Sequence, residues 1–121
     1  MKVAVTAVGN DLDAEVDPRF GRAPYFVIVE TDDMSFEAVA NAAAEASGGA
    51  GPAAAQAVAD TGAQAVVTGN CGPNAHRTLE AAGIKVYIGA GGTVREAVER
   101  YLAGGYEETA GPNVRGGFGS S

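Results

Sequence analysis

The stretch AVVTGNCGPNAHRTLEAAG, residues 65–83, decides the fold of this 121-residue chain. It opens with a short, β-branched apolar run, which predicts a buried strand. Residues 70–72 then predict a tight turn, and Pro73 suits the first position of a helix because proline fixes φ and lacks an N–H group. Apolar residues at helical spacing continue to Gly83, which predicts the helix stop. The turn therefore follows a strand and precedes a helix, which is where open α/β sheets bind ligands.

The composition limits the class of protein. We expect one domain over residues 1–105, followed by a glycine-rich and flexible tail over residues 106–121. The formal net charge of −7 argues against a general nucleic-acid binder, which needs a surplus of Lys and Arg. The single cysteine excludes an internal disulfide, and no apolar run approaches membrane-spanning length. These features predict a cytoplasmic protein without nucleic-acid or membrane partners.

Periodicity and turn residues predict the remaining elements. The predicted strands span residues 3–8, 25–31, 35–41, 65–69 and 85–89, and the predicted helices span residues 52–61, 73–82 and 94–102. Two helix–strand units each open on Gly-Pro, at residues 51–52 and 72–73, and residues 42–51 predict a flexible connection before the first of them. A strand, a hairpin and two such units predict a mixed α/β sheet of five strands in the order 3-2-1-4-5, with strand 2 antiparallel and helices on both faces. In this order Asn10, after the first strand, shares a crevice with the turn at residues 70–72.

The loop DPRFGR, residues 17–22, leaves from the same edge of the sheet. Arg19 and Arg22 carry forked, permanently charged donors that suit the oxygens or sulfides of an anion. The alternative is that they form ion pairs with Asp17 or Glu15 and only order the loop. Both interpretations stay open at this stage.

Cys71 and His76 are the side chains near the turn that could ligate a metal. A helix start lowers the pKa of a thiol and favours the thiolate that binds soft metals, whereas the alternative for Cys71 is a small buried hydrophobe. The spacing from Cys71 to His76 matches no standard zinc motif, and we expect His76 to be a partly exposed surface side chain. Gly72 and the N–H groups of Asn74 and Ala75 can contact an anion without any particular side chain.

Two segments carry a resemblance to a known family. DPRFGRAPYFVIVE, from Asp17, and GNCGPNAHRTLEAAGIKVY, from Gly69, resemble the dinitrogenase iron-molybdenum cofactor biosynthesis family, which includes NifX-like proteins, the carboxyl domain of NifB-like proteins and the molybdenum-copper orange protein. The resemblance runs from Lys2 to Asn113 and implies an RNase H-like fold. It also implies non-catalytic binding or carrying of anionic metal-sulfur clusters. An aliphatic residue is common in the family at the position of Cys71, so the resemblance does not imply a thiolate ligand.

The predicted function is therefore cluster binding and not an enzyme activity. The cluster would contain molybdenum, with iron or with copper, would be held non-covalently or through Cys71, and could be absent from the purified protein. We expect a cluster donor or acceptor protein as partner, and a monomer or a weak homodimer. The predicted contacts lie in the Arg19–Arg22 loop, in the turn at residues 70–74 and beside them: Asn10, Arg19, Phe20, Gly21, Arg22, Asn70, Cys71, Gly72, Asn74 and His76, with Cys71 and His76 also as candidate metal ligands.

Two other functions stay open. A crevice of this kind also suits an adaptor that binds a nucleotide or another small anion. An RNase H-like nuclease would need carboxylates that converge at the strand ends to hold two metal ions. Asp11 and Asp13 follow the first strand, but the strand at residues 65–69 carries no carboxylate to join them.

Overall fold

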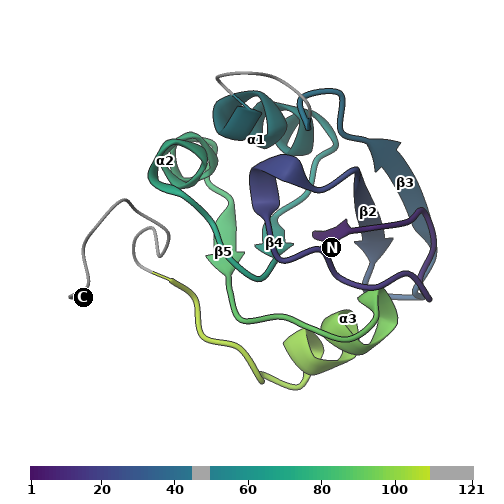
Figure 1. Cartoon of the computed structure of the whole chain (residues 1–121). Helices are drawn as coiled ribbons and strands as arrows, with labels where there is room; N and C mark the ends of the chain where they lie inside the picture. Colours follow the sequence, from purple (N-terminus) through teal and green to yellow (C-terminus); the bar gives the residue numbers. More distant parts are fainter. Residues whose placement is uncertain (45–49, 110–121) are drawn as a thin grey trace.

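The computed structural model describes residues 1–44 and 50–109. A five-stranded sheet lies between helices (Figure 1). The strands are β1 (Lys2–Ala7), β2 (Tyr25–Glu30), β3 (Phe36–Ala40), β4 (Ala65–Val67) and β5 (Lys85–Tyr87), and the helices are α1 (Ala50–Asp60), α2 (Pro73–Ala81), α3 (Val94–Leu102) and the 3-10 turn η1 (Phe20–Arg22). Most of the predicted flexible connection, at residues 45–49, and of the predicted tail, at residues 110–121, lies outside the described residues.

The strand order is β3-β2-β1-β4-β5, which confirms the predicted fold class. β2 runs antiparallel to β1 and β3, and β4 runs parallel to β1 and β5. In this register Val5 lies opposite both Val27 and Val67. Parallel neighbours need a crossover connection, and α1 and α2 supply the two that the sheet requires. The carboxyl ends of β1 and β4 therefore meet at one edge of the sheet.

The sheet separates two buried clusters of apolar side chains. Helices α1 and α2 cover one face, and α3 covers the other (Figure 1). Because side chains alternate along a strand, Ala4 packs toward α1 and α2, whereas Val3 and Val5 pack toward α3. None of the described helices is both long and apolar enough to span a membrane.

Most element boundaries differ from the sequence prediction by one or two residues, and two of these differences bear on the site. Helix α1 begins at Ala50, two residues before the predicted start at Pro52. Proline is tolerated there because the N–H groups of a first helical turn have no partner inside the helix. Strand β4 ends at Val67 and not at Gly69, since the chain beyond it turns to pair with the 17–22 loop.

The first residues of the predicted tail pair with the sheet. The N–H of Thr109 donates to the carbonyl of Val86 at 2.8 Å, and Glu108 forms an antiparallel bridge with Tyr87. The guanidinium of Arg100 lies 4.8 Å from the ring centroid of Tyr106. The predicted boundary at residue 105 therefore falls before the last contacts with β5.

The 17–22 loop meets the turn after β4 backbone to backbone. The N–H of Asn70 donates to the carbonyl of Pro18 at 2.7 Å, and the N–H of Phe20 donates to the carbonyl of Asn70 at 3.3 Å. A Cβ atom added to Gly69 would lie 2.6 Å from the Cα atom of Pro18. Only glycine fits at residue 69, because this gap is too small for a side-chain carbon.

We expect Gly69→Ala to destabilise the protein by about 1–3 kcal/mol, the usual cost of forcing extra carbon into a packed site. Chemical denaturation of both proteins measures the difference in the free energy of unfolding. Gly91→Ala is the matched control, since a Cβ there meets nothing within 4 Å. Equal stability of the two variants would contradict the close approach of Pro18.

Candidate functional site

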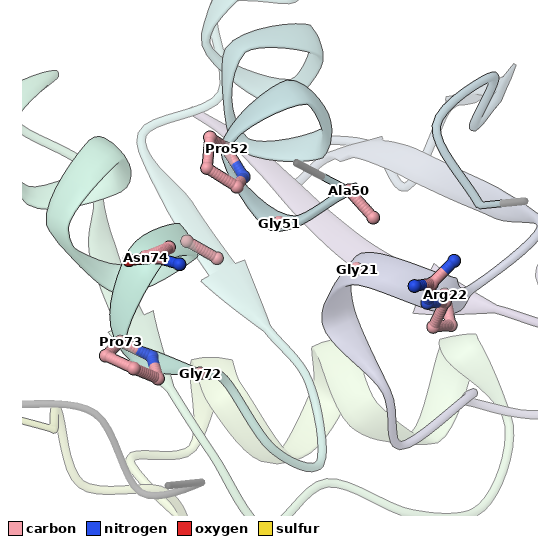
Figure 2. Close-up of a pocket in the computed structure, with 9 residues that line it drawn as sticks. Gly21, Arg22, Ala50, Gly51, Pro52, Gly72, Pro73 and Asn74 are labelled. Atoms are coloured by element: carbon pink, nitrogen blue, oxygen red, sulfur yellow. The ribbon is translucent and has the colours of Figure 1, made fainter. Parts of the chain in front are cut away.

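A pocket of about 280 Å³ opens where η1 meets the amino ends of α1 and α2. Figure 2 shows Gly21 and Arg22 on one side of it, the start of α1 above it and the start of α2 on the other side. The lining residues are Gly21, Arg22, Ala50, Gly51, Pro52, Gly72, Pro73, Asn74 and Ala75. Most of these are small residues or prolines, so the main chain forms much of the wall.

Glycine and alanine let the three segments approach one another. A Cβ atom on Gly21 would lie 3.4 Å from the Cα atom of Gly51, and a Cβ atom on Gly51 would lie 3.3 Å from the Cβ atom of Ala75. These separations are tight for carbon atoms. The missing side chains therefore bring the amino ends of α1 and α2 to one pocket.

Two helices, α1 and α2, begin at the pocket. The N–H groups of a first turn have no carbonyl partner inside the helix, and together with the helix dipole they make this end partly positive. Helix α2 has no side-chain cap at Gly72. Both α1 and α2 thus present an end that attracts an anion.

Helix α3 differs because the N–H groups at its amino end already have hydrogen-bond partners. Thr93 and Glu96 form a capping box, in which each side chain accepts a hydrogen bond from the backbone N–H of the other residue. The N–H groups of Val94 and Arg95 donate to the carbonyls of Ala14 and Leu12, both at 2.9 Å. The donors of α3 are thus used within the fold, and its amino end lies outside the pocket.

The two arginines of the 17–22 loop have different surroundings. Arg22 lines the pocket, and its Nη1 donates to the carbonyl of Ala44 at 2.9 Å. Arg19 is outside the lining and forms a forked ion pair with Asp17, with Nε–Oδ1 at 3.1 Å and Nη2–Oδ2 at 3.0 Å. The loop-ordering alternative is thus confirmed for Arg19, and anion contact through Arg19 stays a prediction.

Asp17 is a buried carboxylate held by its neighbours. Burial by itself raises the pKa of Asp17, but hydrogen bonds from the side chain and N–H of Arg19 outweigh it and lower this pKa below the ordinary value. The carbonyl of Asp17 accepts from Thr6 Oγ1 at 2.7 Å, and the Thr6 and Thr68 hydroxyl oxygens lie 2.8 Å apart. The loop is thereby fixed to β1 and to the end of β4.

The prediction of a lowered thiol pKa at Cys71 is wrong. The side chain is 1% exposed and belongs to the core cluster beneath α1 and α2. Burial raises the pKa of Cys71 to about 11, because removing a thiolate from water costs more than the nearby helix end returns. The small buried hydrophobe is the interpretation that the structure supports. Ligation of a metal by Cys71 stays a prediction.

The prediction of a partly exposed His76 is also wrong, since the residue is 6% exposed. Helix α2 buries Ala75, His76 and Leu79, whereas Ala82 after the helix is exposed. The buried face of α2 therefore keeps the apolar Ala75 and Leu79 and widens to take in the imidazole. Within residues 1–44 and 50–109, no group of three His, Cys, Asp or Glu side chains could hold a metal ion.

Some of the other residues predicted to contact the ligand line the pocket, and others hold the 17–22 loop in place. Gly21, Gly72 and Asn74 line the pocket together with Arg22. Phe20 is buried against Phe26, with ring centroids 5.5 Å apart, and anchors the loop.

Asn70 holds the same loop through its backbone, whereas Asn10 is exposed and outside the lining. The start of α1, at Ala50, Gly51 and Pro52, was missed as part of the site. The Gly-Pro pair that opens both helix–strand units is the sequence signal that could have found it.

The fold and the pocket define a small α/β protein with a backbone-lined pocket at the amino ends of two helices. Residues 1–104 match the model of the family described as dinitrogenase iron-molybdenum cofactor, and the chain belongs to this family. The resemblance predicted from the two sequence motifs is thus confirmed.

Three individual proteins are similar over most of their length. The orange protein of Desulfovibrio gigas, solved in its apo form, is 50% identical, with a TM-score of 0.91 over 93% of this chain and 96% of that chain. A NifB-like protein of Thermotoga is 41% identical, with a TM-score of 0.82 over 96% of this chain and 98% of that chain. An uncharacterized protein of Methanocaldococcus jannaschii is 31% identical over 111 residues, which are 89% of this chain and 91% of the relative.

We expect Asp17→Asn to destabilise the protein by about 1–3 kcal/mol at pH 7, the range for leaving buried hydrogen-bonding groups unmatched. The pKa of Asp17 is lower in the folded protein than in the unfolded chain. The carboxylate therefore contributes fully to the free energy of unfolding above pH 3.8, the ordinary carboxyl pKa, and this contribution is lost as the pH falls through the pKa of the folded state. Chemical denaturation of wild type and variant between pH 7 and pH 2 measures this. Asp60→Asn, at an exposed carboxylate, is the control. A pH-independent difference for Asp17→Asn would contradict the analysis.

We expect the Cys71 thiol to resist alkylation in the folded protein. With a pKa of about 11, roughly one thiol in 1,000 is ionised at pH 8, and the thiolate is the reactive form. Iodoacetamide should react more than about 100-fold more slowly in buffer than in urea. The folded rate should rise about tenfold per pH unit up to the raised pKa. Comparable rates in buffer and urea at pH 8 would show that the thiol is accessible and ionised.

Proposed function

We propose that this protein binds and carries an anionic metal-sulfur cluster, either an iron-molybdenum cofactor or a molybdenum-copper sulfide, without bond-breaking chemistry of its own. Family membership and the similarity to the orange protein connect the chain with the iron-molybdenum cofactor or a related cluster. The observation that carries the proposal is the convergence of two helix amino ends and Arg22 at one pocket. Such an arrangement favours negative charge.

The pocket fits a compact inorganic anion. Its volume of about 280 Å³ lies just below the range for small-molecule sites, about 300–1,000 Å³. A dinucleotide would overfill it. The N–H groups of a helix start can donate to sulfide or to oxide, because they recognise negative charge and not one ligand geometry. The glycines and prolines of the wall leave room for a ligand to touch the main chain.

We propose that the cluster is held non-covalently. The Cys71 thiol is buried and protonated at neutral pH, so a thiolate ligand would have to leave the core and ionise. Arg22 keeps its charge at every physiological pH and can reach across a sulfide face with several donors. Exchange with a donor or acceptor protein, in the cytoplasm, is part of the same proposal.

The test is anaerobic reconstitution with tetrathiomolybdate and copper, and separately with isolated iron-molybdenum cofactor. The wild-type protein should retain a visible chromophore in a fixed stoichiometry through gel filtration. Arg22→Ala should bind about 10–100-fold more weakly, since a hydrogen bond to a charged group is worth about 1.5–3 kcal/mol. Cys71→Ala should keep the colour if the cluster is held non-covalently.

Arg95→Ala is the matched control, because it removes the same charge from α3 on the opposite face of the sheet. It should bind as wild type does. A wild-type protein that stays colourless with both clusters would refute the proposal. Loss of colour in Cys71→Ala alone would refute non-covalent binding and support the thiolate ligand.

A second candidate is an adaptor that binds phosphate or a nucleotide, because helix amino ends also bind phosphate groups. A thermal-shift series with phosphate, ATP, molybdate and tetrathiomolybdate separates the two. Stabilisation by thiomolybdate alone supports the cluster carrier. Stabilisation by phosphate or ATP alone supports the adaptor.

A further inference from the structure

Asn41, just after β3, is a buried polar side chain, 6% exposed, and it lies outside the pocket lining. Its Nδ2 donates to the carbonyl of Ala23 at 2.8 Å and to that of Gly21 at 3.3 Å. Its Oδ1 accepts from the N–H of Ala43 at 3.1 Å. One amide therefore satisfies three backbone groups from two segments.

These contacts fix both ends of the Arg22 side chain. The carbonyls that Asn41 holds belong to the residues before and after Arg22, so they set the direction in which this side chain leaves η1. At the other end, Arg22 Nη1 donates to the carbonyl of Ala44, whose own N–H donates to the carbonyl of Asn41 at 3.1 Å. The Asn41 side chain thus acts directly on the backbone on both sides of Arg22, and it reaches the guanidinium tip only through the turn that its Oδ1 forms with the N–H of Ala43.

Asparagine suits this position for a chemical reason. An amide offers two donors on one nitrogen and an acceptor on the oxygen, and only one orientation satisfies two carbonyls and one N–H here. A carboxylate of the same shape would place negative charge against two carbonyl oxygens. Alanine would leave the backbone groups of both segments without partners in a buried place, which is costly.

We propose that Asn41 is a positioning residue of the anion pocket, which holds Arg22 and the Gly21 wall in place without touching the anion. The inference rests on the proposed function, since it assigns to Asn41 a role in binding that Arg22 carries out. It adds a residue from the end of β3 to a site otherwise built from η1, α1 and α2.

The first experiment titrates tetrathiomolybdate anaerobically into wild type, Asn41→Ala and Val98→Ala. Val98 is fully buried in α3, on the far side of the sheet, so its truncation lowers stability without touching the pocket. Asn41→Ala should bind at least about tenfold more weakly than wild type, and Val98→Ala within about twofold at a similar loss of thermal stability. Equal affinities in the two variants would overturn the inference and leave the proposed function standing.

The second experiment separates positioning from a general loss of structure. If Asn41 acts through Arg22, then Asn41→Ala should weaken binding in an Arg22→Ala background by less than about threefold, far below its effect in wild type. Additive effects would show that Asn41 acts independently of Arg22 and would overturn the inference. If Asn41→Ala does not fold, Asn41→Ser, which is neutral and keeps one hydroxyl donor for the two carbonyls, replaces it in all measurements.

A third measurement tests the inference in the protein without any ligand. Amide hydrogen exchange at residues 21–23 and the Nε–H signal of Arg22 report the geometry of η1 directly. Asn41→Ala should speed this exchange and broaden or shift the Arg22 signal, whereas Val98→Ala should leave both unchanged relative to its global stability. A wild type that binds no cluster refutes the proposed function, and unchanged exchange and Arg22 signal in Asn41→Ala refute the inference.

Discussion

The pocket depends on the backbone pairing between the 17–22 loop and the turn that follows β4. The backbone of Asn70 forms two hydrogen bonds with this loop. Because Gly69 has no side chain, Pro18 can lie where a Cβ atom of residue 69 would otherwise be. The bridge between Arg19 and Asn70 is parallel, so the loop pairs with the chain just beyond the end of β4. Without this pairing η1 would lose the contacts that join it to the chain just before α2, and this wall of the pocket would be less well held.

An acidic protein can hold an anion only where positive charge is concentrated locally. The chain carries a net charge of −7, yet the pocket gathers one guanidinium and two partly positive helix ends. The same fold treats its third helix differently, because Thr93, Glu96 and loop carbonyls already satisfy the amino end of α3. The location of the site thus follows from which helix ends the fold leaves open.

Burial determines the properties of Cys71 and His76, and their neighbours in the sequence do not predict it. The position of Cys71 before a helix predicts a thiolate, but the turn directs its side chain into the core, where desolvation dominates. His76 is buried because the inward face of α2 is wider than its apolar residues Ala75 and Leu79 and takes in the neighbouring position as well. Asn41 carried no signal in the sequence, since a lone asparagine after a strand is usual in a turn.

The sequence by itself determined the strand order, the helix after each Gly-Pro and the meeting of the 17–22 loop with the turn after β4. The helices and strands follow from local patterns of β-branched runs, turn residues and apolar periodicity, and the strand order and the shared edge follow from the rules by which such elements connect. Only the tertiary structure decided that Arg22 and not Arg19 lines the pocket, that α1 contributes a wall and that Cys71 is buried. Those outcomes depend on which groups come together from distant segments, and the balance between desolvation and hydrogen bonding there is set by packing.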